Sequence, residues 1–290
     1  MNAKKTLIKD AYLRDTIERF TRHKMAVVGL VVLLLEILLL FLLPVVLGSQ
    51  PNEITPYFNA KPSAEFPLGT DTTGRDLLAR LLYGGQTSLG IGLLAVLLQA
   101  LIGIPLGIIA GYYRGAAEAV IMRLADVFNS IPNMCLNLVL VTVFSPSFWT
   151  IVVVIGITGW PSFTRLLYSS VLSIREKEYV EAARAIGTKN SKIMIKYILP
   201  NAVSPALVAF TFGVPSAILS ESALSFLGLG IQIPQSTWGN MLNAAQSLAV
   251  VANQPWMWIP PGLCIMITLI SINLFGDGLR DALDPKTKVG

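Results

Sequence analysis

The chain has 290 residues, of which 53% are hydrophobic and 13% are charged, against roughly 25% charged residues in an ordinary globular domain. This composition excludes an intrinsically disordered chain, which needs low hydrophobicity and high charge. Two cysteines in this length cannot form a disulfide framework, so small disulfide-stabilised secreted folds are excluded as well. The formal net charge of +5 becomes informative once the basic residues are placed along the chain.

Six apolar segments are long enough to be membrane helices. The first, 26–47, has one charged residue, Glu36, and as a helix it would extend about 33 Å, enough to cross the ~30 Å hydrocarbon core. It is too long for the apolar region of a signal peptide, so we expect it to be retained. The sequence therefore predicts an all-α, polytopic membrane protein with six transmembrane helices. The other five are predicted at 87–111, 130–146, 148–168, 203–229 and 256–276.

The lysines and arginines predict the orientation of these helices. All but three of the 22 lie before the first helix, in the loops after the second and fourth helices, or after the sixth helix. The three others are Lys61, Arg75 and Arg80, between the first and second helices. Because cytoplasmic segments carry the excess of basic residues, both termini are predicted to be cytoplasmic. Topology thus accounts for the basic residues, and we expect the lipid bilayer rather than nucleic acid as a partner.

Two local patterns concern the second membrane helix. Residues 73–82 can start a helix with its leucines on one face, which predicts a short helix at the outer membrane surface. Further along, Gly103, Gly107 and Gly111 lie four residues apart on one face. Such a face predicts the close approach of another helix.

The loop at 175–200 is longer than a connection between two membrane helices requires. Its first half is rich in helix-forming residues and ends at Gly187, a typical C-terminal stop. Ser191 is expected to cap a second short helix that ends before Pro200. Two short helices joined by a turn at Gly187 are therefore predicted at the cytoplasmic face.

The same loop contains Glu181-Ala182-Ala183, then Gly187, then Leu199-Pro200, and it resembles the coupling loop of ABC-importer permeases. This chain has Tyr197 where the family has Ile, a departure that affects docking detail only. The resemblance implies that the loop docks on a cytoplasmic ATPase subunit. The residues implied in this coupling are Glu178, Glu181, Ala182, Ala183, Gly187, Leu199 and Pro200.

Three further stretches, 66–77, 221–230 and 276–285, resemble the C-type permease of the dipeptide, oligopeptide and nickel importer group. The resemblance covers about residue 15 to the C-terminus. It implies a type I importer membrane domain over 69–290, and a cytoplasmic segment, first helix and outer loop within 1–68. The implied function is import of di- or oligopeptides across the inner or plasma membrane, with nickel or a metal chelate as the alternative substrate.

The resemblance also implies the partners. A second, homologous permease would complete the translocation path, and an extracytoplasmic binding protein would deliver the substrate. One or two cytoplasmic ATPase subunits would bind ATP and Mg²⁺. This chain has no GxxxxGK[ST] loop to hold phosphates, so no cofactor is expected in it.

Ionisable residues within membrane helices are candidates for function. Glu221, between Ser220 and Ser222, is predicted either to line the translocation path or its gate, or to form a hydrogen bond between helices. Glu36 is predicted to line a pathway or to contact the second permease.

Enzymatic alternatives have little support in the sequence. His23 is the only histidine, and two distant cysteines cannot complete a zinc site with it. An intramembrane protease needs a nucleophile and a base at one depth, and neither a GxSxG motif nor a lysine within the predicted helices supplies them. A passive channel would leave the coupling loop unexplained. We therefore predict a non-catalytic transport subunit.

Overall fold

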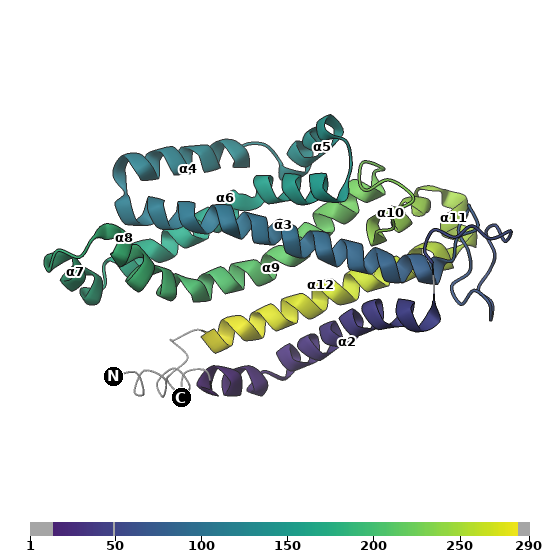
Figure 1. The fold of residues 1–290 in the computed structure, drawn as a ribbon, viewed down its shortest axis with the longest axis horizontal. Coiled ribbons are helices and arrows are strands. Elements are labelled where there is room, and N and C mark those ends of the chain that lie inside the picture. The colour runs from purple at the N-terminus through teal and green to yellow at the C-terminus, as the bar shows by residue number, and fades with distance from the viewer. Residues whose placement is uncertain (1–13, 49, 284–290) are drawn as a thin grey trace.

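The computed structural model describes residues 14–48 and 50–283, and these are mostly helical (Figure 1). The basic residues Lys4, Lys5, Lys9, Lys286 and Lys288, used above to predict orientation, lie outside the described residues. The long helices are α2 (Lys24–Leu47), α3 (Leu77–Tyr113), α6 (Phe148–Arg175), α9 (Leu199–Phe226) and α12 (Pro255–Leu283). The short ones are α4 (Gly115–Asn129), α5 (Asn133–Phe144), α7 (Glu178–Ala185), α8 (Asn190–Ile193), α10 (Trp238–Leu242) and α11 (Leu248–Asn253).

Five helices in the described part of the chain are long and apolar enough to cross a membrane. Four are α2, α3, α6 and α12, and the fifth is a 37-residue helix over Asn190–Phe226. This helix comprises α8, a π-helical turn at Met194–Ile198, and α9. The pair α4 and α5, bent by 83° at the break between them, makes a sixth span if it is counted as one. The predicted all-α, polytopic fold is confirmed.

The break between α4 and α5 corrects the helix predicted at 130–146. α5 runs from Asn133 to Phe144 only, and α4 precedes it as a separate helix. Pro132 explains the break, because it has no N–H group and disfavours the helical conformation at the residue before it. α4 escaped prediction because its charged residues interrupt the apolar pattern.

α3 and α6 pack closely through the glycines of α3. A Cβ atom added at any of the three would come within 2.8 Å of a Cβ atom of α6, closer than real Cβ atoms approach. The prediction that this glycine face admits another helix is confirmed, and that helix is α6. The pairs are Gly103 with Phe163, Gly107 with Leu167, and Gly111 with Val171.

α2 and α12 run side by side along one edge of the bundle (Figure 1). Gly29 of α2 lies against the main chain of α12, since a Cβ atom there would be 2.7 Å from the Ser271 oxygen. Much of the remaining α2 surface is apolar and exposed, as at Leu38, which is 54% exposed. Such a surface is suited to contact with lipid.

The start of α3 corrects a second expectation. No separate surface helix forms at 73–82, because α3 begins at Leu77 and continues unbroken. The Asp76 carboxylate caps it by accepting a hydrogen bond from the Leu78 N–H at 2.9 Å. The leucine face of this turn is buried in a cluster with Trp238 of α10. It therefore packs on protein and not on a membrane surface.

The two ends of the bundle carry different segments (Figure 1). α7 and α8 lie at the end where α2 begins and α12 finishes. α10 and α11 lie at the opposite end, together with the loop that joins α2 to α3. The segments with most of the described basic residues therefore share one end.

Candidate functional site

A polar cavity of about 350 Å³ lies among α3, α5, α6 and α9. None of its lining residues is charged, and its polar side chains are amides and hydroxyls. Such a cavity offers hydrogen bonds to a polar solute without imposing a fixed charge on it. These side chains are Gln99, Asn133, Asn137, Thr158, Ser162, Ser216 and Ser220.

Two of these amides, Asn133 and Asn137, come from the first two turns of α5, directly after the break. Asn137 is 3% exposed, and its Oδ1 atom lies 2.7 Å from the Thr158 hydroxyl of α6. On the α9 side, the Ser220 hydroxyl donates to the main-chain oxygen of Ser216 at 2.8 Å. The cavity walls are therefore held by one contact between α5 and α6 and by one within α9.

Ser220, Glu221 and Ser222, predicted together as path or gate residues, lie on two different faces of α9. Ser220 lines the polar cavity, whereas Glu221 and Ser222 do not. Glu221 is fully buried and accepts hydrogen bonds from Ser225 at 2.7 Å and from Ser88 of α3 at 3.2 Å. The Ser222 hydroxyl lies 3.4 Å from the same carboxylate.

The contact of Ser88 extends this network to α10. The Ser88 hydroxyl accepts a hydrogen bond from the Trp238 N–H at 3.2 Å, and the Trp238 indole donates to the Leu81 oxygen at 3.0 Å. Glu221 thus joins α9 to α3, and through Ser88 to α10. Ser88 and Trp238 lie 133 and 17 residues from Glu221 in the chain, so local sequence could not identify them as its partners.

The loop at 175–200, predicted to be a coupling loop and called the coupling loop below, forms the predicted turn at Gly187, whose φ angle of +73° favours glycine. The Thr188 N–H donates to the Ala183 oxygen at 3.0 Å, which closes the end of α7. In α7, Ala183 is buried, whereas Glu178, Glu181 and Ala182 are exposed. The exposed residues form a surface open to a partner.

The second half of the loop differs from its prediction. Ser191 does not cap a helix, because α8 follows Lys189 and has no side-chain cap. Pro200 does not end one either, since it lies inside the continuous helix over Asn190–Phe226, directly after the π-helical turn at Met194–Ile198. Leu199 and Pro200 are exposed at this start of α9. The loop therefore continues directly into a membrane helix.

Tyr112 of α3 holds the coupling loop, a role that the sequence did not indicate. Its hydroxyl donates to the Asn190 side chain at 2.7 Å, and its main-chain oxygen accepts from Arg175 at 2.8 Å. The Arg184 guanidinium lies 5.7 Å from the centre of its ring. Its position at the end of a long apolar run is the one feature of the sequence that could have indicated this role.

At the opposite end, a cluster of charged residues precedes and begins α3. The Asp71 carboxylate accepts from Arg75 at 2.8 Å and lies 3.7 Å from Arg80. Burial by itself would raise the pKa of Asp71, but hydrogen bonds from Arg75 and Thr73 outweigh it and hold that pKa below its usual 3.8. This cluster fixes the loop to the first turn of α3, and the Arg80 guanidinium also donates to the Pro234 oxygen at 3.3 Å.

Glu36 lies between α2 and α12. Its Oε1 atom accepts a hydrogen bond from the Thr268 hydroxyl at 2.7 Å. Its Oε2 atom is buried and has no hydrogen-bond partner among the described residues. The contact that the structure gives to Glu36 is therefore to α12 of the same chain.

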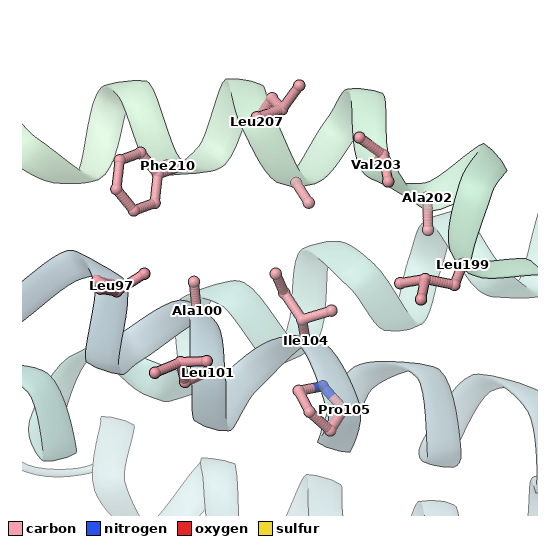
Figure 2. Close-up of a pocket in the computed structure, with 11 residues that line it drawn as sticks. Leu97, Ala100, Leu101, Ile104, Pro105, Leu199, Ala202, Val203, Leu207 and Phe210 are labelled. Atoms are coloured by element: carbon pink, nitrogen blue, oxygen red, sulfur yellow. The ribbon is translucent and has the colours of Figure 1, made fainter. Parts of the chain in front are cut away.

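An apolar groove of about 370 Å³ separates α3 from α9 near the coupling loop (Figure 2). Figure 2 shows Leu101 and Ile104 on the α3 side and Leu207 and Phe210 on the α9 side, with the groove between them. Every residue that lines it is apolar. The groove thus contrasts with the polar cavity in its chemistry.

Comparison with known proteins places these features in a family. Residues 103–289 match the model of the binding-protein-dependent transport system inner membrane component, and residues 11–62 match the N-terminal transmembrane domain of oligopeptide transport permease C. The chain belongs to this family of transport permeases. It is a multi-pass protein of the inner membrane, and the C-type permease resemblance is confirmed.

Individual relatives cover nearly the whole chain. The dipeptide transport system permease DppC of Alkalihalophilus pseudofirmus is 39% identical over 95% of this chain and 90% of its own length. The oligopeptide transport system permease OppC of Bacillus subtilis is 37% identical, with the same coverage of both chains.

Solved structures support the fold. An inward-facing form of the MetNI methionine ABC transporter aligns with a TM-score of 0.58 at 20% identity, over 72% of this chain and 97% of that one. The membrane domain thus has the type I ABC importer fold.

Proposed function

We propose that this chain is the C-type permease subunit of an ATP-driven importer for di- and oligopeptides. The observation that carries the proposal is the similarity over 95% of the chain to proteins named as dipeptide and oligopeptide permeases. The match of the first helix to the N-terminal domain of oligopeptide permease C supports the same subunit type.

The polar cavity forms part of the translocation path, which a second, homologous permease completes. Ser220 and the amides that face the cavity offer donors and acceptors to the N–H and C=O groups of a peptide. A nickel ion would instead favour imidazole or thiolate ligands, so the chemistry of this lining supports a peptide over a metal.

The coupling loop docks on a cytoplasmic ATPase subunit, and both termini lie on that side of the membrane. Support comes from the exposure of Glu178, Glu181 and Ala182 on α7, and from the position of α7 at the same end of the bundle as the start of α2 and the end of α12. Ala183 does not face the ATPase. It is buried and holds α7 against the bundle. ATP and Mg²⁺ bind to the ATPase partners, of which there are one or two kinds, and this chain performs no catalysis.

Movement of the coupling loop reaches the path through one continuous helix. The helix over Asn190–Phe226 includes both the end of the loop and Ser220 of the cavity wall. Closure of the ATPase dimer would therefore change access to the cavity. An extracytoplasmic binding protein delivers the peptide at the end that carries α10 and α11.

Uptake by the reconstituted complex tests this function. The chain would be co-expressed with its partner permease and ATPases, placed in proteoliposomes, and supplied with binding protein and radiolabelled trialanine. We expect ATP-dependent accumulation that stops when the ATPase is inactivated. Accumulation of nickel but not of trialanine would overturn the peptide assignment.

The position of the coupling loop has a separate test. A cysteine introduced by Ala182→Cys should crosslink to the ATPase subunit, because Ala182 is exposed on α7. Crosslinking only to the binding protein would reverse the proposed orientation.

A further inference from the structure

One buried amide in the polar cavity has an unused hydrogen-bonding atom. Gln99 is 8% exposed, lies in the middle of α3 and lines the cavity. Its Nε2 group donates to the Ile155 main-chain oxygen of α6 at 3.1 Å. Its Oε1 atom has no hydrogen-bond partner among the described residues. Because Gln99 lines the cavity and this oxygen is not among the buried unpartnered atoms, it is open to the cavity and can accept a hydrogen bond from a bound donor.

The orientation of this amide is fixed by its neighbours. The Ile155 oxygen can only accept a hydrogen bond, so the nitrogen of the amide must face it and the oxygen must face away. Gly159 of α6 leaves the space that the amide occupies, since a Cβ atom there would be 2.3 Å from Nε2. Gly159 also lines the cavity. The amide is therefore clamped between two helices at the cavity wall.

A second amide of the same cavity has the same arrangement on α5. Asn137 of α5 is 3% exposed, and one end of its amide is held by Thr158 at 2.7 Å. The other end has no partner among the described residues. Two anchored amides with free atoms thus line one cavity, in which every lining residue is uncharged.

The geometry points to Gln99 as a substrate-binding residue whose amide oxygen accepts a hydrogen bond from a main-chain N–H of a peptide in the path. This inference rests on the proposed function and adds how the path recognises its substrate. A main-chain N–H occurs in every peptide, so the contact is independent of peptide sequence. Because the cavity is uncharged, it also tolerates peptides of either charge.

The test compares Gln99→Leu with Gln86→Leu in the assembled transporter. Gln86 is a matched control, since it lies on the same helix and donates to the Leu40 main-chain oxygen at 2.7 Å but does not line the cavity. The substrates are trialanine and trialanine N-methylated at its central amide, with uptake corrected for the affinity of each for the binding protein. ATP hydrolysis stimulated by the binding protein reports assembly and coupling.

We expect Gln99→Leu to lower kcat/KM for trialanine about three- to tenfold, the effect of one lost hydrogen bond, with ATP hydrolysis unchanged. Wild type should prefer trialanine over the methylated peptide, and Gln99→Leu should remove that preference. Gly159→Ala should reproduce the loss, because it displaces the amide without removing it. Gln86→Leu should keep both the uptake and the preference.

Three results would overturn the inference. Unchanged uptake and preference in Gln99→Leu would show that the amide does not contact the peptide. An equal fall in uptake and in ATP hydrolysis would indicate a structural role. If the wild-type complex took up no trialanine, the proposed function itself would fail and this inference would fall with it.

Discussion

α3 packs against α6 and against α9 in two different ways. Its contact with α6 is close along its length, because three glycines bring the two main chains together. Its contact with α9 is held at one end by Ser88 and Glu221 and is open near the coupling loop, where the apolar groove of about 370 Å³ lies (Figure 2).

The difference assigns separate roles to the helices. α3 and α6 form a scaffold with little space for rearrangement, since close-packed interfaces change only at a cost. α9 is joined to the coupling loop and has space beside it at that end. We therefore expect a movement of the loop to shift α9 against the scaffold near the loop and to leave α3 and α6 in place.

The largest effect on stability should come from filling the α3–α6 contact. Gly107→Leu would place a Cβ atom 2.6 Å from the Leu167 Cβ atom and 2.7 Å from the Thr164 oxygen, with further atoms beyond it. Overpacking of this kind costs about 1–3 kcal/mol or more, and we expect loss of the monodisperse peak in size-exclusion chromatography.

A glycine of the same helix provides the control. Gly90 of α3 has only ordinary contacts, with Phe148 atoms 3.6 and 3.7 Å from an added Cβ. Gly90→Ala should leave the protein as stable as wild type, or slightly more stable through its helix propensity. Equal behaviour of Gly107→Leu and Gly90→Ala would contradict the close α3–α6 contact.

Removing the link between α9 and α3 should have the next largest effect. Glu221→Ala leaves the buried hydroxyls of Ser88 and Ser225 without their acceptor, at about 1–3 kcal/mol. We expect a lower Tm in differential scanning fluorimetry. Ser220→Ala, next to it in sequence but at the cavity surface, should stay within about 0.5 kcal/mol of wild type. Similar Tm values for the two variants would argue against a role for Glu221 in joining the helices.

A change at the turn of the coupling loop should cost less stability but should stop transport. Gly187 has a φ angle of +73° and no atoms within 4 Å of an added Cβ, so Gly187→Val introduces backbone strain of about 1–2 kcal/mol without a clash. We expect inserted, assembled complex with little ATP-dependent uptake. Gly115, with a φ angle of +59° and equally open surroundings, is the control, and Gly115→Val should keep its uptake. Normal uptake by Gly187→Val would remove the coupling role.

The smallest effect concerns the pH dependence of the loop before α3. The folded-state pKa of Asp71 lies below 3.8, so Asp71 stabilises the folded state at higher pH, and that contribution is lost as the pH falls through its folded-state pKa. Thermal unfolding of wild type from about pH 5 to pH 3 should show the loss. Asp71→Asn should flatten the profile, and an unchanged slope would show that Asp71 contributes no such linkage.

The sequence predicted those features that depend on local pattern. Apolar runs identified the membrane helices, and the spacing of Gly103, Gly107 and Gly111 identified a face for close packing. Gly187 predicted its turn because positive φ favours glycine strongly. Such features require no knowledge of distant residues.

Features that depend on distant contacts were not predicted. The sequence did not indicate a role for Gln99, because its anchor at Ile155 lies 56 residues away on α6. The division of Ser220 from Glu221 depends on which helices flank α9, and no pattern within 203–229 contains that information. Pro132 marks a break in a helix, but α4 before the break was not predicted because its charged residues interrupt the apolar pattern.

A comparison of two spin-label distances tests the contrast between the two contacts most directly. One pair would be Leu101→Cys on α3 with Leu207→Cys on α9, both exposed at the groove, in a variant without Cys135 and Cys264. The other would be Leu93→Cys on α3 with Ile157→Cys on α6. In the assembled transporter we expect ATP to change the first distance and leave the second unchanged. A constant α3–α9 distance, or an α3–α6 distance that changes equally, would contradict the account.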